Sequence, residues 1–160
     1  MNEPTFVYTT YIHASAGAVW RGLIDPAFTG RDWGVEPISE WRVGSPLIWK
    51  EGDATISDAD QVVLEAAPPR RLAYTWHTFS MDWARTHGFD QGLVDLLSAE
   101  PRSRVLFEID EVEDGVVKLT LTHTFGTAGK LREMCSQAWP RLLGELKTLL
   151  EIDAGERSPV

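Results

Sequence analysis

The sequence has little cysteine, comparatively few basic residues and no long apolar run. Its single cysteine, Cys135, has no internal partner for a disulfide, which favours a reducing compartment. Lys and Arg number 15 against 24 Asp and Glu, and the resulting net charge of −9 argues against binding to nucleic acid or to an anionic membrane surface. The apolar stretches are too short to span a bilayer, and the N-terminus lacks the pattern of a secretory signal. We therefore expect a cytoplasmic protein.

What is present suits one globular domain. The chain has 160 residues, of which 43% are hydrophobic and 24% charged, so we predict a single domain over residues 1–152 and a flexible tail over residues 153–160. Tryptophan is unusually frequent. Its large apolar surface suits a thick core, a ligand pocket or a protein interface. The seven tryptophans stand at positions 20, 33, 41, 49, 76, 83 and 139.

Hydrophobic periodicity predicts an α+β domain. β-branched and aromatic residues indicate a strand over 5–13, and Ser15 is placed to cap a short helix that is followed by a second one over 26–33. A repeat of apolar residues at spacings of four and three predicts a long helix over 128–152. The expected architecture is one curved antiparallel sheet packed on this helix. Six further strands are expected at 35–43, 47–50, 54–66, 72–79, 102–111 and 117–123.

Residues 80–100 interrupt the alternation of strands and turns. Asp90 is placed to cap a short helix that would carry Leu93, Leu96 and Leu97. An apolar-faced insertion between two strands is typical of a lid or an interface, and otherwise pads the open end of a sheet.

Several short strings resemble one known superfamily. They are IHASAGAVWRGLIDPAFTGRDW at 12–33, WRVGSPL at 41–47, LEAAPPRRLAYTW at 64–76, LTLTHTF at 119–125 and LLGELKTLL at 142–150. In order and coverage they look like the START-like superfamily, also called SRPBCC, with its helix-grip fold. The nearest resemblance is to the domain of the activator of the heat-shock protein 90 ATPase. The chain departs from that pattern at Ala16-Gly17, where Pro-Glu is common, and in the length of the 80–100 insertion.

The resemblance implies a binding function. The superfamily binds lipids, hormones, polyketides or other apolar small molecules, and a minority of its branches catalyse reactions. A long helix across a curved sheet tends to leave a hollow at one end, where a ligand can lie. The alternative is that the same aromatic residues only fill a core. The candidate ligand-binding residues are Trp20, Trp33, Tyr74, Trp76, Trp83, Phe89, Phe107, Leu121, His123, Cys135 and Trp139.

Strand alternation assigns the histidines to faces. His123 shares a face with Leu121 and should point toward the hollow, either as a hydrogen-bond donor to a ligand or as a core histidine that neighbouring groups satisfy. Trp76 and His77 must face opposite sides of one strand, and we expect Trp76 in the cavity and His77 in solvent. His13 and His87 are expected on the surface.

No catalytic or metal-binding pattern stands out. His77, Asp82, His87 and Asp90 lie close in sequence, but their spacing matches no standard metal site. Nucleophile-elbow and phosphate-loop motifs are missing, and Cys135 lies on the apolar face of a helix. We therefore predict a protein without a cofactor that binds an apolar or amphipathic small molecule. The alternatives are a co-chaperone-like interaction domain, and after it a cyclase or hydrolase; a homodimer is possible in either case.

Overall fold

The computed structural model describes residues 3–32 and 34–157, and its centre is a five-stranded antiparallel sheet. The strand order is β1-β8-β7-β6-β5, so the first strand lies beside the last. Thr5 pairs with Thr124 at one end of the β1–β8 ladder, and Ile12 pairs with Val117 at the other. The strands are β1 (Thr5–Ile12), β5 (Val63–Ala67), β6 (Arg71–Thr75), β7 (Arg104–Glu113) and β8 (Val116–Thr124).

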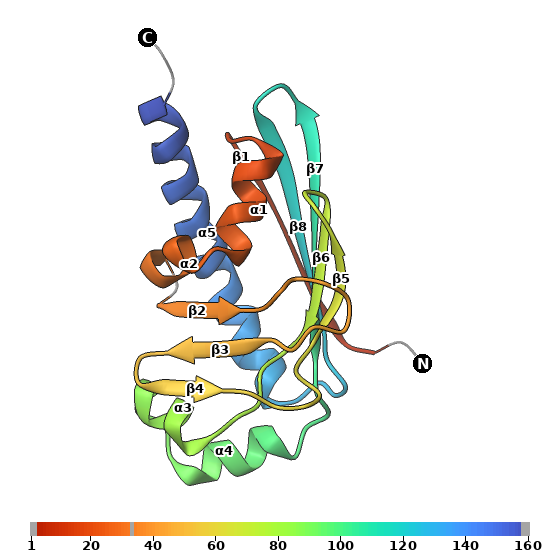
Figure 1. The fold of residues 1–160 in the computed structure, drawn as a ribbon. Helices are drawn as coiled ribbons and strands as arrows, with labels where there is room; N and C mark the ends of the chain where they lie inside the picture. Colours follow the sequence, from red (N-terminus) through yellow and green to blue (C-terminus); the bar gives the residue numbers. More distant parts are fainter. Residues whose placement is uncertain (1–2, 33, 158–160) are drawn as a thin grey trace.

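A second, three-stranded antiparallel sheet lies across one end of the first (Figure 1). It consists of β2 (Val35–Ile38), β3 (Ile48–Glu51) and β4 (Ala54–Ile56). The prediction of one continuous sheet was therefore wrong, and an isolated bridge between Pro46 and Val62 links the two. The expected strand over 54–66 is divided because Asp58 accepts a hydrogen bond from the Asp60 amide at 2.9 Å and turns the chain.

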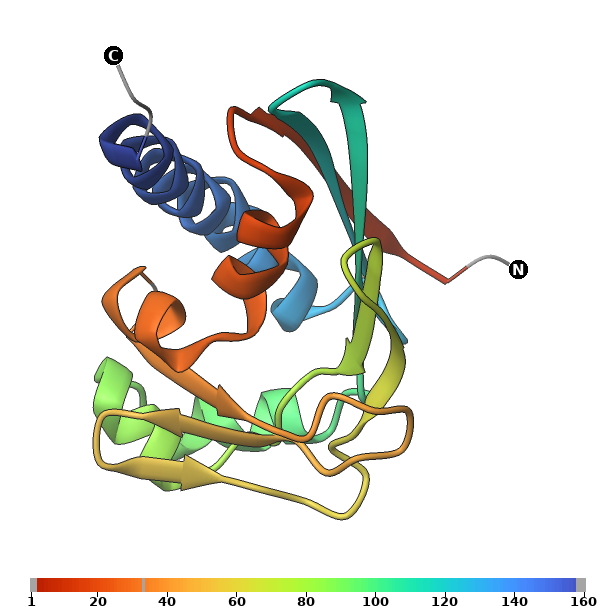
Figure 2. The ribbon, with the colours of Figure 1, turned by 45° about the horizontal axis from the view of Figure 1, so that its top comes forward.

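Three helices surround the interior together with the two sheets (Figure 2). Ser15 caps α1 (Ala16–Ile24) by accepting the Ala18 amide at 3.1 Å, as its position predicted, and α2 (Pro26–Asp32) follows. The helix α5 (Lys130–Arg157) buries one stripe of side chains against the sheet and continues five residues beyond the predicted end at 152. The stripe is Leu131, Cys135, Trp139, Leu143, Leu146 and Leu150.

Residues 80–100 form two further helices. The expected one is α4 (Gln91–Ser98), with the Asp90 carboxylate accepting the Leu93 amide at 3.0 Å. The other is α3 (Met81–His87), which Ser80 caps in the same way. Both lie near the small sheet at one end of the molecule (Figure 1). No helix of the described ranges is long and apolar enough to cross a membrane.

Strand alternation builds the core as the sequence predicted. On β8, Val117, Leu119, Leu121 and His123 are buried while the residues between them are only partly covered. The buried residues of β7 face the same side. The α+β, helix-grip architecture is thus confirmed, with a long helix on the inner face of a curved antiparallel sheet.

Candidate ligand-binding cavity

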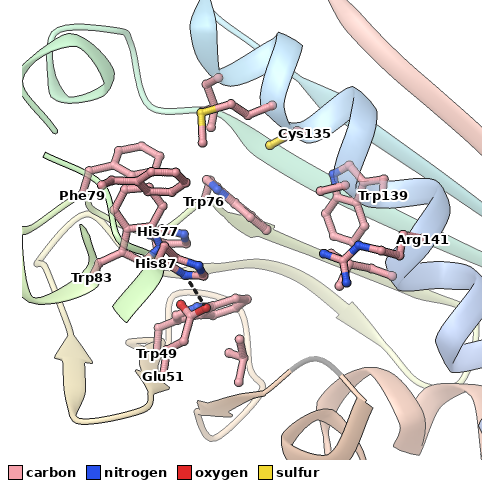
Figure 3. A pocket seen from close by; sticks show the side chains of 16 residues that line it. Trp49, Glu51, Trp76, His77, Phe79, Trp83, His87, Cys135, Trp139 and Arg141 are labelled. Atoms are coloured by element: carbon pink, nitrogen blue, oxygen red, sulfur yellow. Dashed lines mark ion pairs between the residues drawn. The ribbon is translucent and has the colours of Figure 1, made fainter. Parts of the chain in front are cut away.

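A cavity of about 290 Å³ lies between α5, the small sheet and α3 (Figure 3). Six aromatic side chains and six further apolar ones form most of its wall, and four polar side chains interrupt them. The aromatic residues are Trp49, Trp76, Phe79, Trp83, Phe89 and Trp139; the other apolar ones are Val35, Leu131, Met134, Cys135, Ala138 and Leu142; the polar ones are Glu51, His77, His87 and Arg141.

The aromatic rings of the wall contact one another in a chain. The ring centroid of Trp76 lies 5.5 Å from that of Trp49 and 5.6 Å from that of Trp139. On the other side Phe79 meets Trp83 edge-on at 5.0 Å. Because these rings come from β3, the segment after β6, α3 and α5, the wall joins elements that are distant in sequence.

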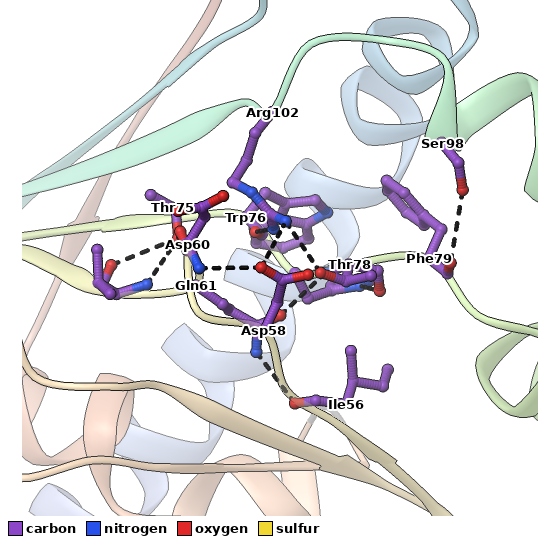
Figure 4. Close-up of polar contacts among 12 residues, drawn as sticks. Ile56, Asp58, Asp60, Gln61, Thr75, Trp76, Thr78, Phe79, Ser98 and Arg102 are labelled. Atoms are coloured by element: carbon purple, nitrogen blue, oxygen red, sulfur yellow. Dashed lines mark hydrogen bonds and ion pairs between the residues drawn. The ribbon is translucent and has the colours of Figure 1, made fainter.

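The segment 76–79 is central to this wall and lies outside any strand. The strand β6 ends at Thr75. Beyond it the Trp76 amide still donates to the Ser103 carbonyl at 2.8 Å, whereas the Trp76 carbonyl and the Thr78 amide bond to side chains (Figure 4). Arg102 donates to the Trp76 carbonyl at 2.9 Å and to the Thr78 hydroxyl at 3.0 Å. The first bond satisfies a backbone carbonyl beyond the end of β6. Together the two bonds hold the segment that carries the rings of Trp76 and His77.

Gln61 anchors the same segment from below. Its side chain is fully buried, and its Oε1 accepts the Thr78 amide at 2.9 Å. Its Nε2 donates to the carbonyls of Leu47 and Ile56, at 2.6 and 3.0 Å. One amide group therefore connects the cavity wall to both ends of the small sheet's last hairpin.

His77 is buried, not exposed to solvent as predicted, with 6% of its surface accessible. The prediction assumed that the strand continues to residue 79; once the ladder stops at Thr75, alternation no longer decides which way a side chain points. The ring lies against Trp49 and Trp83 and lines the cavity. Burial lowers its pKa to about 4, so the ring is neutral at pH 7.

His123 is a core histidine whose hydrogen bonds are satisfied by neighbouring side chains. Trp139 Nε1 donates to its Nδ1 at 3.0 Å, and its Nε2 lies 2.8 Å from the Ser103 hydroxyl. Because an indole N–H only donates, Nδ1 must accept and Nε2 must carry the proton. His123 therefore donates to Ser103 instead of activating it, and burial lowers its pKa to about 3.

Glu51 and His87 form the polar side of the cavity. His87 Nε2 lies 2.7 Å from Glu51 Oε1, and the Glu51 side chain is only 11% exposed. His87 is exposed, as expected, but it stands in the last turn of α3 instead of a loop and joins that helix to β3. Arg141 lies across the cavity on α5 (Figure 3). Its guanidinium donates a hydrogen bond to the Glu145 carboxylate at 3.2 Å.

Cys135 contributes an inert surface to the cavity. Burial, together with the negative charge of Glu100, raises the pKa of its thiol to about 12. The thiol is therefore protonated at pH 7 and packs as a small apolar group. Within the described residues no group of three His, Cys, Asp or Glu side chains is arranged to hold a metal ion.

The structure divides the predicted site residues into two groups. Five line the cavity: Trp76, Trp83, Phe89, Cys135 and Trp139. Five are core residues outside its lining: Trp20, Tyr74, Phe107, Leu121 and His123. Trp33 lies outside the described residues.

Sequence reasoning missed Trp49, Glu51 and His77 as lining residues. Trp49 and Glu51 are two positions apart on β3 and so share a face, a signal that the short strand made easy to overlook. The expected strand over 47–50 stopped one residue before Glu51, and the contact of Glu51 with His87 joins residues 36 positions apart, which periodicity does not report.

Comparison with known proteins identifies the family. The sequence profile of the family described as "Activator of Hsp90 ATPase homolog 1-like protein" matches residues 13–151. The chain belongs to this family. This confirms the resemblance found in the sequence. A search of curated protein sequences found no match.

Solved structures share the fold at low sequence identity. CalU16 from Micromonospora echinospora is 22% identical, with a TM-score of 0.64 over 95% of this chain and 79% of its own. The Aha1 dimer from Colwellia psychrerythraea is 17% identical, with a TM-score of 0.66 over 93% and 97%. DynU16, a protein of the dynemicin biosynthetic locus, is 16% identical, with a TM-score of 0.66 over 92% and 47%. At these identities the likeness concerns the fold.

Proposed function

We propose that this domain binds an apolar or amphipathic small molecule in the cavity between α5 and the small sheet, without a catalytic step. The observation that carries the proposal is the aromatic wall around a volume of about 290 Å³. Apolar walls with a few polar groups are typical of small-molecule sites. DynU16 belongs to a biosynthetic locus, and this agrees with small-molecule chemistry in the shared fold.

The burial of the tryptophans supports a cavity over a protein interface. Trp20, Trp49, Trp83 and Trp139 are buried, and Trp41 and Trp76 are partly buried, so no tryptophan of the described residues is exposed. The exposed large apolar side chains, in contrast, are spread over several elements. They are Val7, Tyr11, Ile38, Val43, Leu64, Phe89, Leu96, Val112 and Ile152.

The hydrogen-bond direction at His123 supports binding without catalysis. The nearest hydroxyl to a histidine ring is Ser103, and the ring donates to it, which is the reverse of what a nucleophile requires. The Cys135 thiol is likewise protonated.

Native mass spectrometry of the purified protein, followed by tryptophan-fluorescence titration with fatty acids, flavonoids and sterols, tests the proposal. We expect a co-purifying small molecule or saturable quenching with a Kd on the order of micromolar. A clean apo mass together with no response to any compound would overturn it.

A cavity-filling variant locates the binding site. Ala138 lines the cavity on α5, so Ala138→Phe should occupy the space and weaken binding by about tenfold or more. Gln137→Phe is the matched control, because its position is the adjacent, exposed one on the same helix. Equal weakening in both variants, or in neither, would place the ligand elsewhere.

The family description supports a second candidate, a co-chaperone-like interaction domain. The Colwellia relative is a dimer, and self-association of this chain belongs to the same proposal. Sedimentation velocity and a pull-down with purified Hsp90 test it. A monomer that retains no chaperone would leave the small-molecule function alone.

A further inference from the structure

One wall of the cavity offers hydrogen-bond acceptors that no side chain fills. His77 Nδ1 lies 2.8 Å from the Thr78 carbonyl, and since a carbonyl only accepts, this nitrogen carries the proton. In a neutral ring Nε2 then keeps its lone pair. It makes no hydrogen bond within the described residues, although the side chain is 94% buried and lines the cavity.

The same wall carries a second acceptor. The Glu51 carboxylate receives His87 at one oxygen, Oε1, and no bond joins its other oxygen to the described residues. Figure 3 shows His77, His87 and Glu51 together on the side of the cavity opposite Arg141. Both acceptors belong to residues that line the cavity, so a ligand that brings a donor can reach them and gain a hydrogen bond in a largely apolar site.

Trp49 has an unpaired polar group beside this wall. Its Nε1 is buried and is the one buried side-chain N–H of the described residues that has no hydrogen-bond partner. Trp49 stacks on His77, with 5.4 Å between ring centroids, so an unpaired donor and an unpaired acceptor belong to neighbouring rings. This indole N–H is covered by protein atoms, so the acceptor of His77 is the group of the pair that a ligand in the cavity can satisfy.

We propose that the cavity selects aromatic molecules that carry a hydroxyl group, which donates its proton to His77 Nε2 while the ring stacks among the tryptophans. This inference rests on the proposed function and names the ligand class. The aromatic wall supplies affinity for any flat apolar molecule. The His77 side discriminates between a molecule with a free hydroxyl group and the same molecule with that group methylated.

A matched pair of probes tests the proposal in the wild-type protein. 2-Naphthol and 2-methoxynaphthalene share the ring and an oxygen acceptor, and only the naphthol has a donor. We expect isothermal titration calorimetry to give a Kd about tenfold lower for the naphthol. Equal affinities, or tighter binding of the ether, would overturn the inference and leave the proposed function intact. If neither probe bound and no compound of the panel bound, the inference and the proposed function would both be wrong.

A variant assigns the discrimination to His77. His77→Phe keeps a ring of similar size but has no acceptor, so the preference for the naphthol should fall below about threefold while the Kd of the ether stays unchanged. His13→Phe makes the same replacement at an exposed histidine far along the chain and should keep the full preference. An undiminished preference in His77→Phe would also overturn the inference.

Discussion

At the scale of single residues, Gln61 supports the cavity wall through three hydrogen bonds. It touches no cavity atom, yet its amide satisfies one backbone N–H and two backbone carbonyls around the wall. All three groups are in a region where water does not replace a lost partner, since Gln61 itself is fully buried. The position of Trp76 and His77 thus depends on a side chain 15 or more residues earlier.

Gln61→Ala should lower the free energy of unfolding by roughly 3 kcal/mol, because it leaves those three groups unpaired and opens a small void. Urea denaturation measures the change. Gln91→Ala, at an exposed position on α4, is the control and should stay close to wild type. A loss for Gln61→Ala of less than about 1 kcal/mol would mean that water replaces the amide.

At the scale of elements, α3 closes one side of the cavity, and α4 follows it without lining the cavity. We propose that residues 80–100 act as a lid, which contacts at the end of α3 and just after α4 hold in place. His87 joins α3 to β3, and Glu100, just after α4, accepts the Leu131 amide at 3.2 Å at the start of α5. Trp83 is the part of the lid that enters the cavity, and it contacts Phe79 and Phe89. Opening the lid would have to separate these rings.

Trp83→Ala should weaken ligand capture and speed release by about tenfold, because the lid loses its largest contact with the wall. Stopped-flow fluorescence with a compound that binds the wild type measures the off-rate. Leu96→Ala alters an exposed side chain of α4 and serves as control. If affinity and off-rate both stayed unchanged in Trp83→Ala, residues 80–100 would not act as a lid.

At the scale of the whole molecule, two buried neutral histidines make stability depend on pH. Burial lowers the pKa of His77 to about 4 and of His123 to about 3, whereas in the unfolded chain both titrate near 6.5. Below pH 6.5 the unfolded state therefore binds protons that the folded state does not. Stability is full above this pH and falls as the pH drops toward 4.

Each histidine should cost roughly 2 kcal/mol of unfolding free energy at pH 5 relative to pH 7.5. Urea midpoints across this range test the expectation, and His77→Phe should show a visibly shallower dependence because one titrating group is gone. The carboxylates whose pKa is lowered, such as Asp58, lose their contribution only at lower pH and do not mask the slope. A flat profile between pH 7.5 and 5 would contradict the assignment.

The sequence predicted what local periodicity controls. Alternation on β7 and β8 and the caps Ser15 and Asp90 were all readable, because each depends on neighbours within a few residues. On α5 the periodicity predicted the helix and most of its buried stripe, but it favoured Leu142 and Leu149 where the structure buries Leu143 and Leu150. The cavity lining was predicted less completely from the sequence. Trp76 and Trp139 were found, but His77 was misplaced because the end of β6 is set by long-range bonds from Gln61 and Arg102.

The cavity has walls from the small sheet, the segment after β6, α3 with Phe89 just after it, and α5, with lining residues that run from Val35 to Leu142. No contiguous fragment of the chain contains it, so a ligand held there recognises only the completed fold. A ligand that binds the folded state alone stabilises it by mass action. At a free ligand concentration of 100 times Kd, binding adds about 2.7 kcal/mol to the free energy of unfolding. In a cell, a scarce ligand would leave more of this protein open to proteolysis, and its abundance would follow the supply of the molecule it binds.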